Sequence, residues 1–200
     1  MTPFRCVSGA AAPMTTPNID TDVIMPKMFL KGVDRSGLGE GAFHLLRFIE
    51  DKPNPGFVLN RDGYRDTCFL VVGPNFGCGS SREHAVWGLQ QLGIRALIGT
   101  SFAGIFNDNC ANNGLLTISL DAATVGTLAE IVADPGSNRL TVDLEQQIIR
   151  VDGGGNIPFA IEPARKEAFL TGRDAISSTL AFADDIRTFE VRHRADNPWF

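Results

Sequence analysis

Residues 67–99 have the sequence TCFLVVGPNFGCGSSREHAVWGLQQLGIRALIG, and this stretch decides the fold. It begins with a continuous apolar run of strand length, Thr67 to Gly73. A run rich in glycine and serine follows, and the apolar residues from Ala85 to Leu92 then recur at helical spacing. Gly93 is a good end for that helix, and a second apolar run follows it. Strand, helix and strand in this order predict a βαβ unit with parallel strands.

The flanking segments extend the same mixed α/β pattern. Further strands are expected near the N-terminus and around residues 115–120, 140–144 and 148–151, the last two paired as a hairpin. Helices are expected at residues 42–50, 82–92, 121–134 and 163–171 and in the C-terminal tail. Residues 101–114 are compatible with a short helix or an irregular turn, and residues 15–27 with an ordered loop.

Composition and charge set the broad class of the protein. The chain has 200 residues, 44% hydrophobic and 20% charged, as in an ordinary globular domain. No apolar stretch approaches the roughly 20 residues of a membrane helix, and no export signal is recognisable, so a cytoplasmic location is expected. The net charge of −5 argues against nucleic-acid binding.

The cysteines and histidines do not suggest a metal site. Cys6, Cys68, Cys78 and Cys110 are isolated from one another, and the three histidines are scattered. The thiols of a cytoplasmic chain are expected to be free. We therefore expect no metal and no cofactor in this chain.

The glycine- and serine-rich run, Asn75 to Ala85, has a purely structural interpretation. Ser80 and Glu83 fit the S-x-x-E capping box, with Ser80 as the N-cap and Glu83 reaching back. A functional interpretation is an anion site, because Gly77 and Gly79 allow a close backbone approach and Arg82 can grip a carboxylate with two bonds. Local pattern alone leaves both open.

Three better-known glycine motifs do not match this run well. Arg82 occupies the third glycine position of G-x-G-x-x-G, which makes a dinucleotide site a poor fit. No G-K-[ST] follows, so the run is not a P-loop. Neither Ser80 nor Ser81 has glycine two residues later, so the G-x-S-x-G elbow of hydrolases also fails.

Four blocks of the chain, in the same order, resemble the swivelling domain of the aconitase superfamily. They are NIDTDVIMPKMFLK, NFGCGSSREHA, SFAGIFNDNCANNGLL and EPARKEAFLTGRDAISSTL. The size and the loop after NIDTD are similar to those of the free-standing small subunits of bacterial 3-isopropylmalate dehydratases. This resemblance implies one swivelling β/β/α domain over residues 1–200, with a mobile substrate loop at about residues 28–41 and a helical tail.

The resemblance also implies an activity and a partner. The expected enzyme is a hydro-lyase of leucine biosynthesis that interconverts 2- and 3-isopropylmalate by dehydration and rehydration. It is expected to work only with a large subunit, as a heterodimer or heterotetramer, and that subunit is expected to hold a [4Fe-4S] cluster. Related substrates are homoaconitate, citraconate and dimethylmalate. An alternative of another class is a stand-alone anion-binding module in which Ser80 is only a helix cap.

The resemblance assigns roles to single residues. Ser80 is implied to be the base that removes the carbon-bound proton, Arg82 to bind a substrate carboxylate and Ser81 to donate a hydrogen bond. Asp20 and Thr21 are expected either at the wall of the site or in an Asx-turn network that shapes their loop.

The expected substrate loop, at about residues 28–41, carries two basic residues, Lys31 and Arg35. They lie in the segment that is expected to cover a small dicarboxylate hydroxy acid. The alternative interpretation is a solvated glycine-rich loop.

Overall fold

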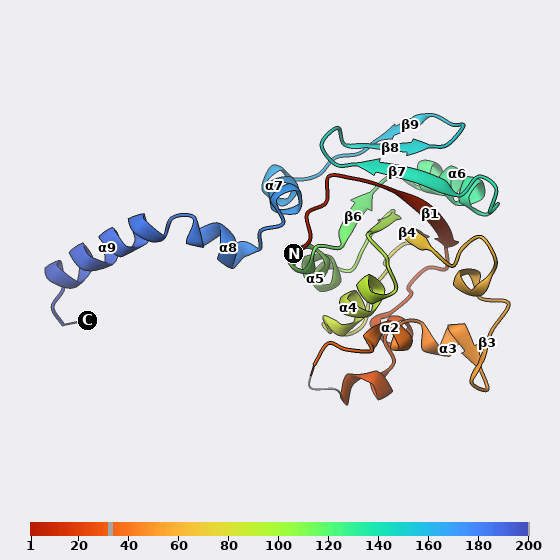
Figure 1. The fold of residues 1–200 in the computed structure, drawn as a ribbon, viewed down its shortest axis with the longest axis horizontal. Helices are drawn as coiled ribbons and strands as arrows, with labels where there is room; N and C mark the ends of the chain where they lie inside the picture. Colours follow the sequence, from red (N-terminus) through yellow and green to blue (C-terminus); the bar gives the residue numbers. More distant parts are fainter. Residues whose placement is uncertain (32–33, 200) are drawn as a thin grey trace.

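The computed structural model describes residues 1–31 and 34–199, and within them a seven-stranded sheet carries helices on both faces (Figure 1). In spatial order its strands are β6 (Leu116–Ser119), β5 (Ala96–Gly99), β4 (Thr67–Val72), β1 (Cys6–Met14), β7 (Arg139–Asp143), β8 (Ile148–Val151) and β9 (Asn156–Pro158). β1, β4, β5 and β6 pair in parallel, and β7, β8 and β9 add an antiparallel half beside β1.

The helices connect these strands or flank them. They are α1 (Thr21–Ile24), α2 (Leu38–Gly41), α3 (His44–Arg47), α4 (His84–Gln91), α5 (Gly104–Asn113), α6 (Ala122–Val132), α7 (Pro163–Thr171), α8 (Ala175–Leu180) and α9 (Ala183–Asp196). Short 3-10 helices span Lys27–Lys31 and Val58–Asn60, and β2 (Phe48–Ile49) pairs with β3 (Lys52–Pro53). The mixed α/β class and the βαβ unit β4–α4–β5 are confirmed, since Leu70 on β4 pairs in parallel with Leu97 on β5. None of the helices in the described ranges has the length and hydropathy needed to cross a bilayer.

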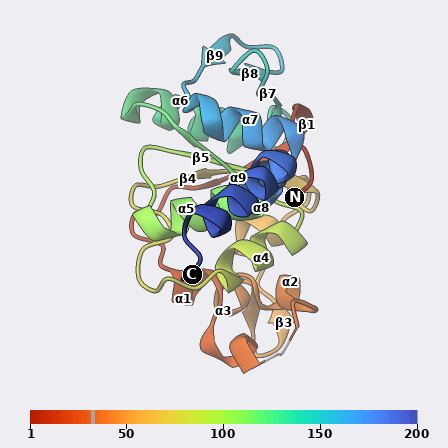
Figure 2. The same ribbon diagram turned by 90° about the vertical axis from the view of Figure 1, so that its left-hand side faces the viewer.

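The sheet separates two hydrophobic cores because successive strand residues point to opposite faces. On β4, Leu70 and Val72 pack in the core beneath α4 and α5, whereas Phe69 and Val71 pack in the core formed with α6, α7 and the hairpin β7–β8. Figure 2 shows α6 and α7 on one side of β4 and β5, with α4 on the other. Burial on both faces explains why this strand is a continuous apolar run rather than an alternating one.

The helix expected over residues 42–50 is wrong in extent. Only His44–Arg47 are helical, and Phe48 and Ile49 turn back in a hairpin with β3. Phe43 has φ 54°, and its side chain is fully buried in the core. A residue in the left-handed region cannot belong to a right-handed helix, so the tertiary position of Phe43 overrides the local periodicity.

The ordered loop expected at residues 15–27 contains one helical turn, α1, which the sequence did not predict. Asp20 is its N-cap, since its Oδ1 accepts a hydrogen bond from the N–H of Val23 at 2.7 Å. In the next loop, the 3-10 helix Lys27–Lys31 and α2 contribute regular structure to the segment 28–41, while residues 32 and 33 lie outside the described residues. The mobility of that loop and the assignment of the whole chain to one domain stay predictions.

Candidate active site

The glycine- and serine-rich run leaves β4 and lies edge to edge with the NIDTD segment. The N–H of Gly77 donates to the carbonyl of Ile19 at 2.8 Å, and the N–H of Thr21 donates to the carbonyl of Cys78 at 2.8 Å. Asp20 and Cys78 form an isolated parallel bridge. Two segments almost sixty residues apart in sequence are therefore joined at the carboxyl ends of β1 and β4, the edge where α/β sheets usually bind ligands.

Gly77 and Gly79 both adopt backbone conformations that favour glycine, with φ 76° and φ 94°. The two differ in their surroundings. A Cβ on Gly77 would lie 2.2 Å from the ring of Phe106 on α5, so close packing of that helix demands glycine there. Gly79 is exposed, and a Cβ there would meet Asp20 at 3.3 Å. Only Gly79 thus presents its backbone to the outside, and Gly77 serves packing.

Ser80 is held by its backbone and contacted at its hydroxyl. Its N–H donates to Oγ1 of Thr21 at 2.9 Å, and the same Thr21 hydroxyl donates to the carbonyl of Ser80 at 3.1 Å. Thr21 is completely buried. Nε of Arg82 donates to Oγ of Ser80 at 3.1 Å, so a cation lies beside the serine oxygen. The geometry orients the Ser80 hydroxyl and places a positive charge against it.

The capping box expected at Ser80 and Glu83 is wrong. Helix α4 begins at His84, and Glu83 stands at the N-cap position without a side-chain cap bond. The backbone N–H of Ser80, which the capping box assigns to Glu83, is taken by Thr21. Oε1 of Glu83 instead accepts from Nδ2 of Asn113 on α5 at 3.0 Å. Long-range partners therefore outcompete the local pair, and Ser80 is not the cap of α4.

Arg82 is paired with a carboxylate that sequence reasoning did not select, that of Asp22. An ion pair joins Nη1 of Arg82 to Oδ1 of Asp22. The Arg82 side chain is only 17% exposed, whereas that of Asp22 is 48% exposed. Among the described residues, Nη2 of Arg82 has no hydrogen-bond partner. The guanidinium group is thus oriented by Ser80 and Asp22 and keeps donors for a further anion.

The signal that could have found Asp22 is its spacing. Asp22 lies two residues after Asp20, within the single turn of α1 that Asp20 caps. Recognising Asp20 as a helix cap from its sequence would have left the carboxylate of Asp22 available as a partner for a cation such as Arg82.

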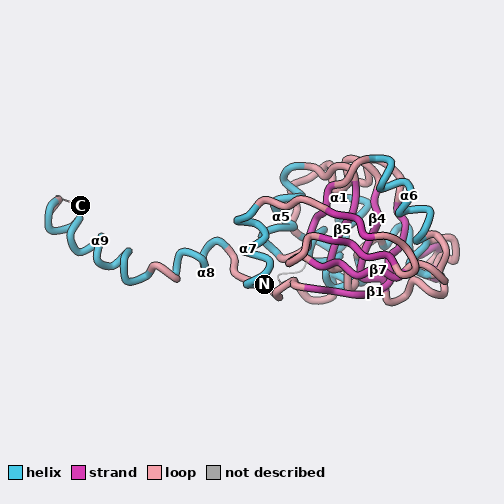
Figure 3. Tube along the Cα trace, turned by 90° about the horizontal axis from the view of Figure 1, so that it is seen from above, coloured by secondary structure: helices cyan, strands magenta, loops and turns pink. Residues whose placement is uncertain are grey.

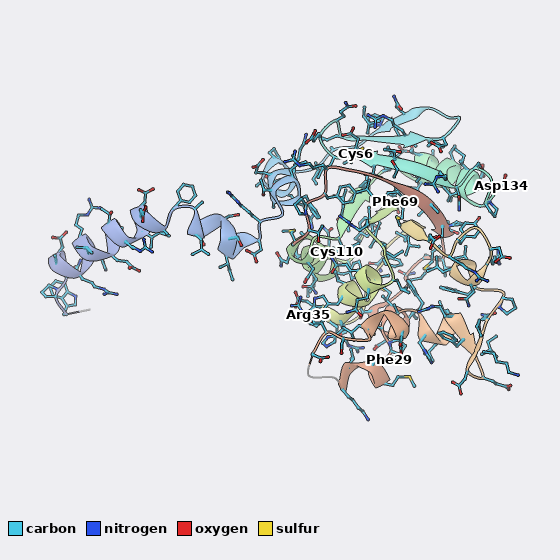
Figure 4. The ribbon with its side chains drawn as sticks, viewed as in Figure 1. Cys6, Phe29, Arg35, Phe69, Cys110 and Asp134 are labelled. Atoms are coloured by element: carbon cyan, nitrogen blue, oxygen red, sulfur yellow. The ribbon has the colours of Figure 1, made fainter. Side chains whose placement is uncertain are left out.

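Arg35 and Lys31 are not brought to Ser80. The Arg35 guanidinium lies over the ring of Trp87 on α4, 4.0 Å from its centroid, and Figure 4 shows Arg35 beside that helix. The Arg35 carbonyl accepts a hydrogen bond from Nε2 of Gln91. Lys31 is exposed at the end of its 3-10 helix. Within the described residues, no hydrogen bond or ion pair joins either of them to Ser80, Ser81 or Arg82.

Asn113, at the end of α5, links several of these groups and was also missed from sequence. Its Oδ1 accepts from Nε1 of Trp87 at 2.9 Å, and its Nδ2 donates to Glu83 at 3.0 Å and to the carbonyl of Asn109 at 2.8 Å. Nδ2 of Asn109 in turn donates to the carbonyl of Ser81 at 3.1 Å. This network fixes the backbone of the run from the side of α5.

The donor set does not fit a metal ion or an iron–sulfur cluster. In residues 1–31 and 34–199 no three histidine, cysteine or acidic side chains gather in a way that could hold a metal. Cys6 lies near the start of β1 and Cys110 on α5, in different parts of the molecule (Figure 4). Cys110 is fully buried, and burial raises the pKa of its thiol well above the usual value. A buried, protonated thiol is a poor cluster ligand.

Family models match the chain in three sections. The model described as aconitase C-terminal domain matches residues 1–123, and a LeuD_N model matches residues 128–163. A model for the C-terminal domain of the 3-isopropylmalate dehydratase small subunit matches residues 176–200. Together they account for most of the sequence, including the candidate site and the last two helices.

Whole-chain relatives agree with these models. A protein of Mannheimia succiniciproducens named 3-isopropylmalate dehydratase small subunit 1 is 54% identical over all of this chain and 98% of its own length. One from Salmonella choleraesuis, named small subunit 2, is 52% identical over all of this chain and 96% of its own.

A solved structure also matches the fold. It is a crystal structure of 3-isopropylmalate dehydratase from Methanocaldococcus jannaschii, with 25% identity and a TM-score of 0.67. The match covers 92% of this chain and 99% of that one. The expected aconitase-type fold is confirmed, and the chain belongs to the family of 3-isopropylmalate dehydratase small subunits, which are parts of a hydro-lyase.

Proposed function

We propose that this chain supplies Ser80 and Arg82 to an active site that it shares with a large subunit, and that the complete enzyme interconverts 2- and 3-isopropylmalate in leucine biosynthesis. The observation that carries this proposal is the contact of the Arg82 guanidinium with the Ser80 hydroxyl, at the carboxyl ends of parallel strands. The relatives that share the whole chain carry the corresponding name.

Ser80 acts as the base for a carbon-bound proton in this proposal. A serine hydroxyl is about as weak an acid as water, so an alkoxide needs strong local stabilisation. The hydrogen bond from Nε of Arg82 supplies part of it, because a charge-assisted bond favours the ionised acceptor by about 1.5–3 kcal/mol. The closed, water-excluded site shared with the large subunit supplies the rest. In the dehydration, the C–H bond breaks, its proton passes to the Ser80 oxygen and its electron pair forms the double bond. The hydroxyl leaves the neighbouring carbon and takes up one proton from the solvent, so that the products are the alkene and water. Rehydration reverses these steps with the hydroxyl on the other carbon.

Arg82 has a second task, which is to bind a substrate carboxylate through the donors that Ser80 and Asp22 leave available. Asp22 balances the charge of this largely buried arginine while the substrate is absent. Ser81 is exposed, and its hydroxyl donates a hydrogen bond to the substrate. Asp20 and Thr21 act as positioning residues, and the exposed backbone of Gly79 lines the anion site.

In this proposal Lys31 and Arg35 belong to the loop at about residues 28–41, and this loop selects the substrate. Arg35 is the better placed of the two, since its contact with Trp87 docks the loop on α4. This position tethers the segment that would close over the alkyl side group of the substrate. The cytoplasmic location of the enzyme stays a prediction.

The residues of this chain do not fit a [4Fe-4S] cluster, so we assign the cluster implied by the resemblance to the large subunit and derive no step through it. Anaerobically purified chain is expected to contain almost no iron or acid-labile sulfide. A full cluster reproducibly bound to the isolated chain would contradict a shared site divided in this way.

The decisive experiment is reconstitution with the cognate large subunit under anaerobic conditions. Turnover of 3-isopropylmalate is expected from the mixture and from neither subunit alone. Homoaconitate, citraconate and dimethylmalate are tested in parallel at the same concentration. Higher kcat/KM with one of these would reassign the substrate, and binding of carboxylates without turnover of any would leave an anion-binding module.

A further inference from the structure

The C-terminal arm, defined as residues 174–199, extends away from the body of the molecule (Figures 1 and 3). Six of its large apolar side chains are more than half exposed: Ile176, Leu180, Phe182, Phe189, Val191 and Trp199. In the described part of the chain, none of them joins either hydrophobic core. An exposed set of this size on one segment indicates a binding surface rather than scattered surface residues.

The arm nevertheless carries strong local signals for helix. Asp174 caps α8, accepting from the N–H of Ser177 at 2.7 Å. α9 has Asp184 and Asp185 in its first turn and Arg194 in its last, as the helix dipole favours. A helix of 14 residues is marginal in water without tertiary contacts. The sequence thus specifies helices whose apolar side chains have no cover within the described part of this chain.

The distribution of apolar side chains on α9 limits what can cover it. Ile186 and Phe189 share one face, but Val191, two positions after Phe189, lies on nearly the opposite side because one turn takes about 3.6 residues. A flat surface covers only one of these faces. A groove that encloses the helix covers both, as in helix-in-groove recognition.

A membrane surface and a second copy of the chain fit less well. The arm has three arginines against five acidic residues, whereas helices that lie on anionic membranes have a basic polar face. Two copies of a 14-residue helix provide about two heptads, below the three or four of a recognisable coiled coil. Such a pair would also leave Val191 uncovered.

The root of the arm is connected to the candidate site through α5. Asp108 and Ala111 of α5, Arg165 of α7 and Ser178 of the arm line an open cavity of about 740 Å³. From the same helix, Asn109 donates to the carbonyl of Ser81. A partner that binds the arm therefore approaches α5, the helix that contacts the glycine- and serine-rich run.

We infer that the large subunit binds the C-terminal arm in an apolar groove, with Ile186 and Phe189 against one wall and Val191 against the other. This inference rests on the proposed function, because the subunit that completes the site must lie beside Ser81. The separate small-subunit model that matches residues 176–200, and the relatives that span the whole chain, show that the arm is a regular part of these small subunits.

The test compares two double variants of the full chain for affinity to the cognate large subunit, measured by anaerobic titration calorimetry. The arm variant is Ile186→Ala with Phe189→Ala. The matched control is Leu45→Ala with Ile49→Ala, which removes exposed side chains from α3 and β2, away from the arm. The arm variant is expected to raise Kd by about 30- to 100-fold, as the loss of two buried apolar side chains predicts. The control is expected to change Kd by less than about threefold.

Val191→Asp tests the second wall of the groove, with Ile49→Asp as its control. A rise in Kd of at least about tenfold is expected, because the groove would bury an unpaired carboxylate. Wild-type Kd in either arm variant would overturn the inference. Failure of the wild-type subunits to associate would overturn it as well.

Two further measurements test whether a second copy of the chain or a membrane covers the arm instead. Sedimentation of the chain alone would assign the arm to self-association if it showed a dimer that Phe189→Ala abolishes. Flotation with phosphatidylglycerol vesicles would assign it to a membrane if the arm variant lost binding. Either result would overturn the inference.

At saturating large subunit, the arm variant is expected to keep wild-type kcat, because the arm holds no site residue. If the subunits bind through the arm but turn over no isopropylmalate, the proposed function fails while the arm assignment stands.

Discussion

The glycine- and serine-rich run and the C-terminal arm differ in whether their side chains find partners within this chain. Around Ser80, the polar groups find partners within the chain: Thr21 binds the backbone of Ser80, and Arg82 binds its hydroxyl. On the arm, side chains such as Phe189 and Trp199 stay exposed. The capping box that the sequence of the run suggested does not form in the structure. The helices of the arm, in contrast, agree with their local sequence signals.

The difference teaches which parts of this molecule are complete without a partner. A buried polar group costs free energy unless it is hydrogen-bonded, so the contacts among Thr21, Ser80 and Arg82 preorganise the half-site in the isolated chain. An exposed apolar side chain stabilises a structure only when another surface covers it and removes it from water. The run is therefore ordered by contacts within this chain, whereas the apolar side chains of the arm would be stabilised only by a second surface.

Ser80→Ala gives the largest expected effect and could break the comparison. If Ser80 is the base, turnover of the reconstituted enzyme falls by about 10²–10⁴-fold. The free energy of unfolding should fall by only about 1–3 kcal/mol, because the Thr21 contacts to the Ser80 backbone remain and only the hydrogen bond from Arg82 is lost. Ser81→Ala is the control and should cost much less, since the proposed function gives Ser81 only a hydrogen bond to the substrate. Near-wild-type turnover in Ser80→Ala would remove the catalytic assignment.

Arg82→Lys sharpens the account of the cation beside Ser80. Lysine keeps the charge but loses the forked geometry that serves Ser80, Asp22 and a substrate carboxylate together. KM is expected to rise by about 10- to 100-fold, the worth of one charge-assisted hydrogen bond. Arg61→Lys, on an exposed side chain, is the control. An unchanged KM would show that Arg82 does not bind the substrate carboxylate.

Thr21→Val tests whether the half-site is organised by its buried hydroxyl. Valine matches threonine in shape but leaves the Ser80 N–H without its acceptor, at a cost of about 1–3 kcal/mol in unfolding free energy. Turnover should also fall, because the Ser80 hydroxyl loses its orientation. Thr21→Ser keeps the hydroxyl and should restore much of both quantities. Denaturant unfolding and turnover together check this, and equal stability of the valine variant and the wild type would contradict it.

Asp174→Ala gives the smallest expected effect and probes the arm. Hydrogen bonds from Ser177 lower the pKa of Asp174 below its ordinary value of 3.8. A carboxyl with a lowered folded-state pKa contributes its stabilisation above the ordinary value and loses it as pH falls through the lowered value. Hydrogen exchange of the α8 amides at pH 7 should therefore be faster in Asp174→Ala.

Asp174→Asn supplies the control for that measurement. Asparagine caps helices about as well as aspartate, so protection of α8 should stay close to wild type at pH 7. In acid, the wild type should lose part of its protection as Asp174 is protonated, whereas the asparagine variant should not. Identical protection in the alanine variant and the wild type would show that α8 does not depend on this cap.

The sequence was most informative where local pattern and burial agree. The apolar run of β4, the βαβ unit and the helix from Asp121 to the Pro-Gly stop were predicted because period, length and end residues pointed the same way. At the glycine- and serine-rich run the local pattern left a helix cap and an anion site both open, because Gly77, Gly79 and Arg82 favoured one and the S-x-x-E spacing favoured the other. The helix expected over residues 42–50 failed because the buried position of Phe43 overrode the periodicity.

Within the site, the chain alone determines which groups are available and their order: two glycines, two serines and an arginine after an apolar strand. Tertiary structure decides how they are used. It gives the Ser80 N–H to Thr21, turns Glu83 toward Asn113 and pairs Arg82 with Asp22. The physical reason is that a hydrogen bond or an ion pair depends on distance in space. Residues from separate segments can meet at the sheet edge and displace partners that are close in sequence.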